Sequence, residues 1–420
     1  MRVGVVGGGI TGLALGYHLA ERGVDSVALE ASDRPGGVIR SDAVAGRVLE
    51  RGPQRTRLVD PVETLVDELS LRDDLVTGDP SLPMYVYARG SLGRAPFSIR
   101  EFLTTDLLSW RGKLRVLAEP LTSQGDESEM AADLFARKFG EEAYRNVIGP
   151  LFGGIYGSDP AEMPAGYAPS PLLDLERRDG SLLVPAVKTA LDTGSRPPIT
   201  FEEGLETLPR GLYRATADRV HLDRPATGLR ADGDGYVLET PDGQERVDRV
   251  VLTTPADVSA DLLTEVAPDA ADRLDRLAYN PLALVSLVAD LDREGFGYQV
   301  GLDADLRTLG VSWTASLFGR DGLYTAFLGG MSDPEALEMD DDALGDLAAR
   351  EFREVTGASA EVLDVARLER GFPAWDRTWR HLDGLELPDG VALATNYTAR
   401  MGIPGRLREA RSLAGELADA

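Results

Sequence analysis

A glycine-rich turn between an apolar strand and an amphipathic helix lies at the start of the chain. Residues 2–6 (RVGVV) predict the strand, residues 11–22 carry apolar positions at helical spacing, and Gly23 predicts the end of the helix. Residues 25–30 (DSVALE) predict a second strand. Two parallel strands joined by a helix form the right-handed crossover of a Rossmann sheet. We therefore expect an α/β fold that includes a nucleotide-binding domain.

The turn itself, GGGITG, contains the G-x-G-x-x-G pattern in the context that a dinucleotide requires. Gly7 permits the tight turn, Gly9 lets the backbone approach a diphosphate, and Gly12 lets the helix pack on the strand. The helix N-terminus offers free N–H groups to the phosphates. Glu30 ends the second strand, where an acid binds ribose hydroxyl groups and disfavours NADP. The residues expected to contact the cofactor here are Gly7, Gly8, Gly9, Ile10, Thr11, Gly12 and Glu30.

A second glycine pair distinguishes NAD from FAD as the expected cofactor. Gly36 and Gly37 follow the second strand in the segment LEASDRPGGVIRS (29–41), which resembles the FAD signature of amine-oxidase-like flavoproteins. FAD is longer than NAD, and a second glycine pair lets the backbone approach its diphosphate and ribityl groups. The alternative is an ordinary turn at this position. We expect FAD as the cofactor, and its contacts here are expected to include Arg34, Gly36, Gly37 and Arg40.

The charge of the chain limits its partners. The net charge is −26, from 70 acidic and 44 basic residues, and only Lys113, Lys138 and Lys188 among the basic residues are lysine. Phosphate contacts need clustered basic side chains, so no nucleic acid is expected as a partner, and purely electrostatic binding to anionic lipid is disfavoured. An acidic surface with few lysines predicts a salt-adapted protein, and the alternative is the arginine bias of a GC-rich genome.

Cysteine and histidine are too scarce for several kinds of chemistry. The chain has no cysteine, which excludes disulfides and thiolate catalysis, and its histidines (His18, His221 and His381) are far apart in sequence. A zinc site or a Ser-His-Asp triad is therefore not expected. No segment has the roughly 18 apolar residues that a membrane span needs. We expect a soluble, cytoplasmic protein without a bound metal.

The N-terminal half changes from mixed to helical character. Residues 61–79 predict a helix, because leucine and valine recur at spacings of three and four. Residues 84–88 and 91–96 predict a β-hairpin around Arg89-Gly90. Residues 99–190 are predicted to be mostly helical.

Strand patterns return from residue 220, and the last strand, 391–395, leads into a helix at 404–418. We therefore expect a discontinuous Rossmann-type FAD-binding domain with an inserted α+β substrate domain, which combines a mixed sheet with a helical subdomain. The expected boundaries are 1–75, 200–265 and 384–420 for the FAD-binding domain, 80–98 and 266–383 for the substrate-binding sheet domain, and 99–199 for the helical subdomain.

Motifs along nearly the whole chain resemble those of one flavoprotein family. The segment LERGPQRT (49–56) is similar to the glutamate-x-glycine-proline segment of protoporphyrinogen oxidases, and residues 126–163 resemble their helical segment closely. Residues 309–330 resemble a strand pair of their substrate domain. Further similar segments are 180–183, 201–212, 250–263 and 391–410. The resemblance is to protoporphyrinogen oxidases and the related coproporphyrinogen III oxidases.

The resemblance implies further site residues. Those implied for FAD are Pro53, Gln54, Ala226, Met401, Gly402 and Ile403. Phe327, Trp313 and Ser312 are implied for the wall of the substrate pocket, and Gly154 could turn a carbonyl toward a pyrrole N–H group. The candidates for binding the propionates of the substrate are Arg40, Arg55, Arg57, Arg89 and Arg94. For each substrate residue, ordinary packing or surface exposure is the alternative.

Three departures from the family pattern affect these expectations. Thr395 and Arg400 stand where relatives usually have glycine, and Met84 stands where some relatives place a basic residue that holds a propionate. The departures leave FAD as the expected cofactor, but they leave the choice of porphyrinogen open.

The resemblance also implies a reaction in heme biosynthesis. A flavin would accept hydride from the methylene bridges of a porphyrinogen in three two-electron steps, with oxygen reoxidising the flavin. No catalytic side chain is assigned, because this reaction needs no nucleophile and no strong base. The expected partner is a tetrapyrrole, while a peripheral membrane contact through the helical subdomain and the choice between monomer and homodimer stay open.

Three other functions are alternatives to this one. Amine oxidases generally place a lysine near the flavin from the second half of the chain, and the last lysine here is Lys188. Carotenoid desaturases share the FAD signature but tend to have a more apolar helical region than residues 99–190. A flavin- or tetrapyrrole-binding protein without catalytic activity would use the same residues as an enzyme.

Overall fold

The computed structural model of the chain describes residues 1–191, 196–398 and 402–420. These residues form two units, each assembled from segments that are separated in sequence. Unit 1 comprises Met1–Gly78, Arg196–Leu277 and Arg380–Ala420, and unit 2 comprises Asp79–Ser195 and Ala278–Trp379.

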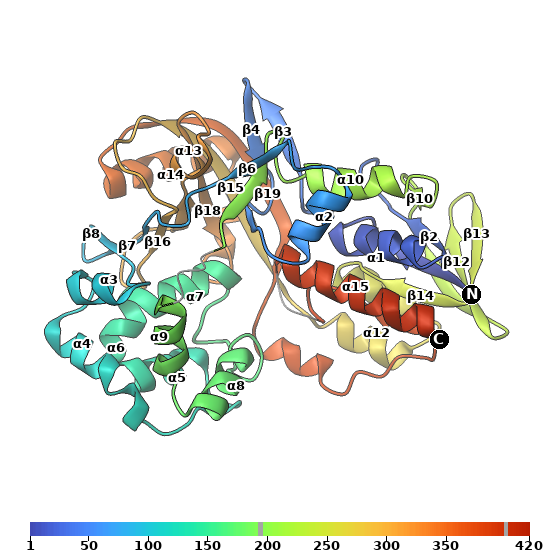
Figure 1. Cartoon of the computed structure of the whole chain (residues 1–420), viewed down its shortest axis with the longest axis horizontal. Helices are drawn as coiled ribbons and strands as arrows, with labels where there is room; N and C mark the ends of the chain where they lie inside the picture. The colour runs from blue at the N-terminus through green and yellow to red at the C-terminus, as the bar shows by residue number, and fades with distance from the viewer. Residues whose placement is uncertain (192–195, 399–401) are drawn as a thin grey trace. The chain divides into compact units, whose positions relative to one another are not determined.

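Unit 1 is built on a parallel sheet in the strand order β10-β2-β1-β14-β20 (Figure 1). The sheet contains β1 (Arg2–Val6), β2 (Asp25–Leu29), β10 (Val220–His221), β14 (Arg249–Leu252) and β20 (Val391–Leu393). The central strand β1 pairs in parallel with both β2 and β14, so helix α1 (Ile10–Glu21) is the crossover between the first two strands. This is the Rossmann arrangement that the glycine-rich turn predicted.

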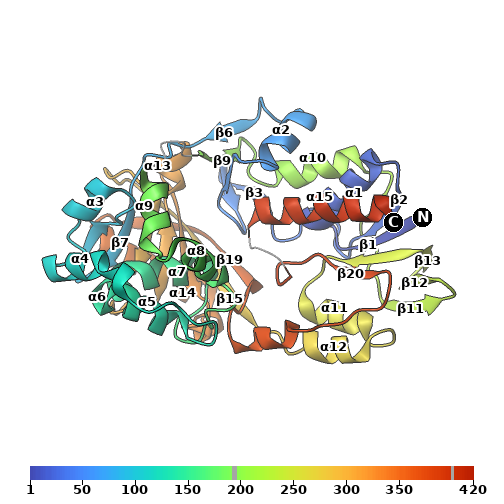
Figure 2. The same cartoon turned by 60° about the horizontal axis from the view of Figure 1, so that its bottom comes forward.

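The two faces of this sheet are covered differently. Val3 and Val5 of β1 pack in one core with Leu13 of α1 and Leu407 of α15 (Ile403–Asp419). On the other face, Gly4 lies against Leu238 of β12, which belongs to an antiparallel sheet in the order β11-β12-β13. Figure 2 shows α1 and α15 on one side of β1 and the pair α11 and α12 on the other. The sheet is therefore buried on both faces, as parallel sheets are.

Unit 1 also contains further strands and helices outside the parallel sheet and its crossover helix. They are β3 (Ser41–Val44), β4 (Arg47–Glu50), β5 (Thr56–Arg57), α2 (Val62–Glu68), β6 (Leu75–Thr77), β9 (Pro198–Phe201), α10 (Thr207–Ala215), β11 (Gly228–Asp232), β12 (Gly235–Thr240), β13 (Gly243–Val247), α11 (Ala256–Leu263) and α12 (Pro268–Leu274).

Unit 2 is built on a mixed sheet in the order β19-β15-β18-β17-β16-β7-β8. Its strands are β7 (Met84–Ala88), β8 (Ser91–Arg94), β15 (Tyr279–Ala289), β16 (Gly297–Val300), β17 (Thr308–Ser312), β18 (Leu323–Gly329) and β19 (Ala360–Pro373). β16 pairs in parallel with β7, and the other neighbours pair antiparallel. One face packs on α14 (Asp341–Thr356), where Tyr324 and Ala326 share a core with Phe352.

The helical part of unit 2 follows the hairpin β7–β8 in sequence. Its elements are α3 (Ile99–Thr104), α4 (Trp110–Leu117), η1 (Glu119–Leu121), α5 (Ala131–Phe139), α6 (Glu141–Ala143), the π-helix η2 (Tyr144–Ile148), α7 (Gly149–Tyr156), α8 (Ser170–Asp179) and α9 (Leu183–Leu191). Val86 and Ala88 of β7 join Val116 and Val147 in a core between the sheet and these helices. The structure therefore groups helices and sheet in one unit.

A buried ion cluster connects three of these helical elements. Lys138 of α5 lies 3.1 Å from Glu119 of η1, and it also contacts Glu176 of α8. None of the three side chains is more than 2% exposed. Glu119 also accepts hydrogen bonds from the backbone N–H groups of Leu182 (3.1 Å) and Leu183 (3.2 Å) at the start of α9. Because these charged groups are removed from water, each one is stabilised only by its charged and hydrogen-bonding partners.

Local signals explain where several predictions succeed or fail. Arg89 and Gly90 both have positive φ (54° and 76°), which gives the predicted hairpin turn. The predicted helix 61–79 is wrong in extent, because α2 ends at Glu68 and Ser70 takes a positive φ of 56°. Residues 266–277 were assigned to the sheet domain, but α12 packs on α11 and belongs to unit 1.

Candidate functional site

The glycine-rich turn of unit 1 requires glycine at two positions. Gly7 has φ 109°, and its N–H donates to the carbonyl of Leu29 at 2.8 Å, which closes the turn onto β2. A Cβ on Gly12 would lie 2.0 Å from the carbonyl oxygen of Gly7. Glycine at position 7 allows the positive φ of the turn, and glycine at position 12 allows the helix to approach the turn closely.

Gly9 opens the N-terminus of α1 toward a ligand. It is the N-cap residue, no side chain caps the helix, and a Cβ at this position would meet nothing within 4 Å. The second glycine pair lies alongside, because Gly36 donates to the carbonyl of Gly8 at 2.8 Å and a Cβ on Gly37 would be 3.3 Å from the Cα of Gly9. Ile10 and Thr11 supply the first N–H groups of the helix. This backbone cradle fits a diphosphate.

Glu30 holds the turn from the end of β2. Its carboxylate accepts hydrogen bonds from the N–H of Gly8 and from the N–H (2.8 Å) and hydroxyl (2.7 Å) of Ser32. A carboxylate has about four acceptor positions. Capacity therefore remains for the ribose hydroxyl groups that the sequence analysis assigned to this residue.

The two predicted arginines differ in their surroundings. Arg34 contacts the buried Glu206 and lies 3.3 Å from Asp42, so it connects the second glycine pair to helix α10. Arg40 is half exposed, and its Nε lies 3.8 Å from Asp42. Burial raises the pKa of Asp42, but hydrogen bonds from Arg51 and Arg34 outweigh it and bring the pKa below its usual value. Arg34 is thus a support of the loop, and Arg40 is available to a ligand.

The segment after β4 is fixed by a buried carboxylate. Glu50 accepts hydrogen bonds from the hydroxyl of Ser41 at 2.6 Å and from the N–H of Leu205 at 2.9 Å. Gln54 follows Pro53, is buried, and donates to the carbonyls of Glu50 (3.2 Å) and Gly52 (3.1 Å). Its side chain therefore braces the turn that contains Pro53.

Arg55 follows in a less hydrated environment. Burial lowers the pKa of Arg55 to about 10, and the positive charge of Arg57 adds to the effect. The guanidinium remains charged at neutral pH.

The closing segment presents a second helix N-terminus. Gly402 has φ 92° and is the N-cap of α15, again without a side-chain cap. Ile403 is buried in the core that α15 shares with α1. Ala226 is half-buried in the connection between β10 and β11. Met401 lies outside the described residues, as does Arg400.

The substrate residues predicted in unit 2 do not share one environment. Phe327 of β18 pairs with Gly310 of β17, and Ser312 pairs with Thr325, so Phe327 and Ser312 lie on the sheet face opposite α14. Trp313 is fully buried, with its ring 5.4 Å from that of Tyr85 in the core beneath α14. The structure therefore makes Trp313 a core residue rather than a wall of a pocket.

Gly154 lies in the last turn of α7, where carbonyl groups have no partner within the helix. A Cβ there would lie 2.0 Å from Oε1 of Gln299 on β16. Glycine is thus needed for the close packing of α7 on the sheet, and this is the packing role that the sequence analysis gave as the alternative.

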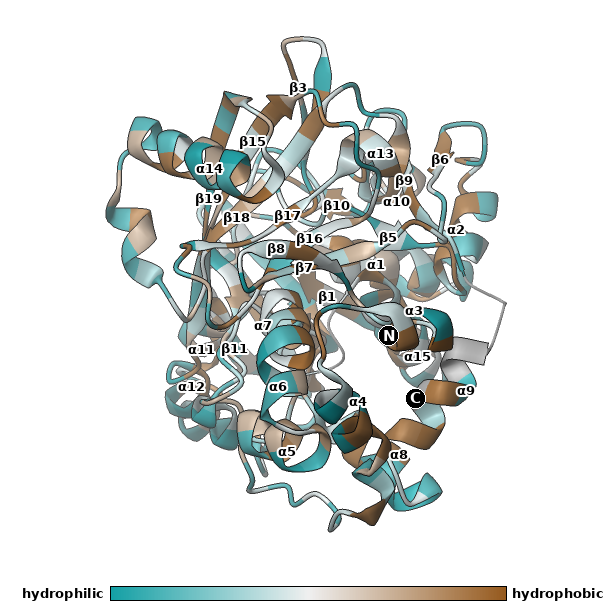
Figure 3. Ribbon diagram, turned by 90° about the vertical axis from the view of Figure 1, so that its left-hand side faces the viewer, coloured by the Kyte–Doolittle hydropathy of each residue, from teal (hydrophilic) through white to brown (hydrophobic). Residues whose placement is uncertain are grey.

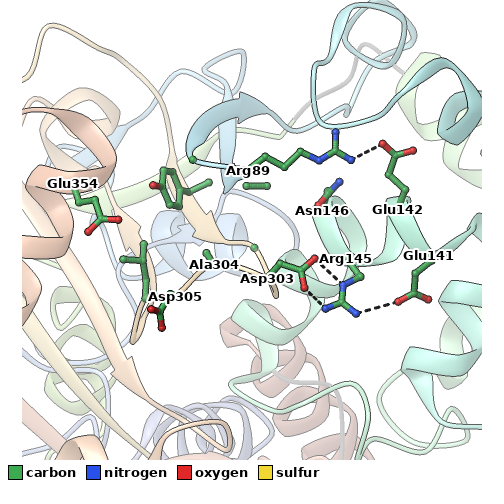
Figure 4. A pocket seen from close by; sticks show the side chains of 14 residues that line it. Arg89, Glu141, Glu142, Arg145, Asn146, Asp303, Ala304, Asp305 and Glu354 are labelled. Carbon is green, nitrogen blue, oxygen red and sulfur yellow. Dashed lines mark hydrogen bonds and ion pairs between the residues drawn. The ribbon is translucent and has the colours of Figure 1, made fainter.

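A cavity of about 600 Å³ lies in unit 2 next to the turn between β7 and β8. Figure 4 shows that Arg89 points toward Glu142 and that Arg145 points toward Asp303 and Glu141. Arg89 is 2.6 Å from Glu142. Arg89, a candidate for binding a propionate, and Arg145 both line this cavity, and both are paired with carboxylates.

The known proteins that this chain is similar to place it in a family. Residues 10–414 match the family model described as flavin containing amine oxidoreductase. The chain belongs to this family. Its flavin requirement agrees with the backbone cradle at Gly9 and Gly36, and the protein is an FAD-dependent oxidoreductase.

The curated proteins that this chain is similar to include two kinds of porphyrinogen oxidase. The chain is 29% identical to the chloroplastic protoporphyrinogen oxidase of Oryza sativa subsp. japonica, covering 99% of this chain and 88% of the relative. It is 28% identical to the coproporphyrinogen III oxidase of Mycobacterium bovis, covering 95% and 93%. The resemblance drawn from the sequence is thereby confirmed.

Solved structures share the fold. A protein from Exiguobacterium sp. 255-15, described as a protoporphyrinogen oxidase, superimposes with a TM-score of 0.82 at 22% identity, covering 99% of this chain and 98% of that one. Wild-type putrescine oxidase bound to putrescine gives a TM-score of 0.72 at 15% identity, with 100% of both chains covered. The expected fold class is confirmed. None of the described helices combines the length and apolar character needed to cross a bilayer.

Proposed function

We propose that this flavoprotein oxidises a porphyrinogen, either protoporphyrinogen IX or coproporphyrinogen III, to the porphyrin. The observation that carries the proposal is the similarity over nearly the whole chain to oxidases of both substrates. The flavin, when bound, would accept the electrons, and oxygen is the acceptor that would reoxidise it. The chain itself would bind, orient and shield the substrate, which agrees with the absence of cysteine from the sequence.

An amine substrate is less consistent with the sequence. The putrescine oxidase structures share the fold, but the last lysine of this chain is Lys188, before most strands of the unit 2 sheet.

The residues that would bind the propionates of a porphyrinogen differ in part from those of relatives. Position 84, where some relatives have a basic residue that holds a propionate, is a methionine. Arg55, with its depleted hydration, and the half-exposed Arg40 are candidates for binding propionate groups.

Steady-state turnover tests the proposal. The FAD-loaded protein would be supplied in air, at high salt, with protoporphyrinogen IX, coproporphyrinogen III or putrescine, while porphyrin fluorescence and oxygen consumption are recorded. We expect saturable porphyrin formation with at least one porphyrinogen and no oxygen consumption with putrescine. Turnover of putrescine without turnover of either porphyrinogen would assign the protein to amines.

We also propose a peripheral membrane contact through the helical part of unit 2. An apolar surface, called here the α3–α4 surface, carries side chains that are 45–89% exposed: Phe97, Ile99, Leu103, Trp110, Leu114, Leu117 and Leu121. Trp110, Leu114 and Leu117 follow helical spacing along one side of α4, and Figure 3 shows the hydrophobic colour on this helix. Scattered apolar residues are normal on a surface, but these seven all fall within residues 97–121, and such a concentration favours a contact site.

The charges around the α3–α4 surface favour an anionic bilayer. Between residues 94 and 121, the exposed charged side chains are Arg94, Arg100, Arg111 and Asp106. This segment is thus locally basic in a chain of net charge −26. An apolar helix side bordered by arginine is the pattern of helices that lie in the interface of a membrane.

The expected result is that Trp110→Asp with Leu114→Asp lowers the fraction of protein that floats with phosphatidylglycerol-containing vesicles about tenfold or more. The reason is that two charged groups would replace two large apolar side chains that are 71% and 65% exposed. Leu302→Asp is the matched control, because Leu302 is 43% exposed but lies outside the α3–α4 surface. Equal flotation of both variants and the wild type would contradict this contact.

A further inference from the structure

Two hydroxyl groups lie side by side on the inner face of the unit 2 sheet, the face opposite α14. Ser286 of β15 and Thr325 of β18 are cross-strand partners, and Thr325 also pairs with Ser312 of β17. Tyr324 and Ala326, on either side of Thr325 in β18, point into the core with α14. Because successive side chains of a strand point to opposite faces, Thr325 lies on the inner face. Side chains of directly paired residues on one face are about 5 Å apart at Cβ.

These hydroxyls are buried but have no protein partner. Ser286 is 5% exposed and Thr325 is 2% exposed. Within the described part of the chain, neither hydroxyl makes a hydrogen bond. Each of the two oxygens keeps a small contact with solvent. Buried polar groups are normally hydrogen-bonded. Both oxygens therefore keep hydrogen-bonding capacity that no described residue uses.

The surroundings of the two hydroxyls are apolar and aromatic. The next positions on the inner face lie two residues away along each strand. There Leu284 of β15 pairs with Phe327 of β18, which in turn pairs with Gly310 of β17. Gly310 has no side chain, and the amide of Gln299 lies next to it. The inner face thus combines an aromatic ring and an aliphatic side chain with a small polar centre.

We propose that Ser286 and Thr325 hydrogen-bond to the pyrrole nitrogens of the tetrapyrrole while its ring packs on Phe327. This inference rests on the proposed function and adds two specificity-determining residues to it. A porphyrinogen presents four N–H donors, whereas the porphyrin presents two N–H donors and two acceptor nitrogens. A hydroxyl both donates and accepts. It can therefore satisfy the nitrogens of substrate, intermediates and product by rotation, which a carboxylate or an ammonium group cannot do.

The test compares Ser286→Ala and Thr325→Val with Thr308→Val. Thr308 is 2% exposed and its hydroxyl also has no partner, but it pairs with Leu328 and so lies on the α14 face of the same sheet. The readouts are the Kd of the porphyrin product, from the shift of its Soret band, and the KM for the porphyrinogen. FAD content and the far-UV spectrum verify folding.

We expect each inner-face variant to raise Kd and KM about two- to tenfold, as loss of one hydrogen bond does, while Thr308→Val changes neither. Thr325→Ser, which keeps the hydroxyl, should restore the wild-type values. Wild-type binding and turnover with unchanged Kd and KM in Ser286→Ala and Thr325→Val would overturn this inference alone. A wild-type protein that neither binds porphyrin nor turns over porphyrinogen would overturn the proposed function, and this inference with it.

Discussion

Replacement of Lys138 by methionine is expected to lower the free energy of unfolding by about 3–5 kcal/mol. The side chain is 1% exposed and neutralises two carboxylates, Glu119 and Glu176, that are themselves buried. Methionine has a similar volume but leaves both carboxylates without their cation. The large effect comes from the unpaired charges rather than from the loss of an ion pair as such.

Lys188→Met is the matched control. Lys188 is 66% exposed and lies 3.4 Å from Asp179, and such surface pairs contribute about 0–1 kcal/mol. Guanidinium unfolding of both variants, followed by tryptophan fluorescence, gives the comparison. Equal stability of the two variants would show that the buried cluster does not hold the helices of unit 2 together.

The same cluster predicts a loss of stability in acid. Burial raises the pKa of Glu119, but hydrogen bonds from Ser181, Leu182, Leu183 and Lys138 outweigh it, so the pKa is lowered overall. A carboxyl with a lowered folded-state pKa stabilises the protein above its unfolded pKa, and this contribution is lost as the pH falls through the folded pKa. We therefore expect the difference between wild type and Lys138→Met to shrink below about pH 4.

Replacement of Gly9 by alanine is expected to weaken FAD binding about tenfold or more, which corresponds to about 1.4 kcal/mol. A Cβ there meets no protein atom within 4 Å, so the fold should tolerate it. The methyl group would instead occupy the space in front of the α1 N-terminus, where the diphosphate has to approach the backbone. The measurement is titration of the apoprotein with FAD by flavin fluorescence.

Gly16→Ala is the control for this variant. Gly16 lies in the same helix, and a Cβ there also meets nothing within 4 Å. Alanine in a helix interior should be neutral or slightly stabilising. If both variants bind FAD as the wild type does, the cradle between the two glycine pairs is not the diphosphate site.

Much of unit 1 could be predicted because its signals are local. The strand, glycine-rich turn and helix at residues 2–22 appear in sequence order, and the hairpin at Arg89-Gly90 follows from its turn residues. The final helix at 404–418 is confirmed as α15. In each case the pattern and the turn residues lie within one short segment, so neighbouring residues decide the local structure.

The features that were missed depend on contacts between distant segments. The extended edge strand β19 was not predicted, because charged residues interrupt its apolar positions and its pairing with β15 is non-local. Trp313 was assigned to the pocket, but the alternation of β17 and the turn that follows it place the ring in the core. Lys138 gave no signal in the sequence, since its partners come from η1 and α8. Single hydroxyl residues within apolar strands, such as Ser286 and Thr325, could have indicated polar contacts to the substrate from the sequence alone.

Anaerobic reduction of the protein-bound flavin tests the central claim most directly. The FAD-loaded protein, in excess and without oxygen, would be mixed at high salt with protoporphyrinogen IX or coproporphyrinogen III. Bleaching of the oxidised flavin band with the appearance of porphyrin fluorescence is the expected result, at three flavins reduced for each porphyrin formed. A flavin that stays oxidised with both substrates, in protein that is folded and loaded with FAD, would contradict porphyrinogen oxidation.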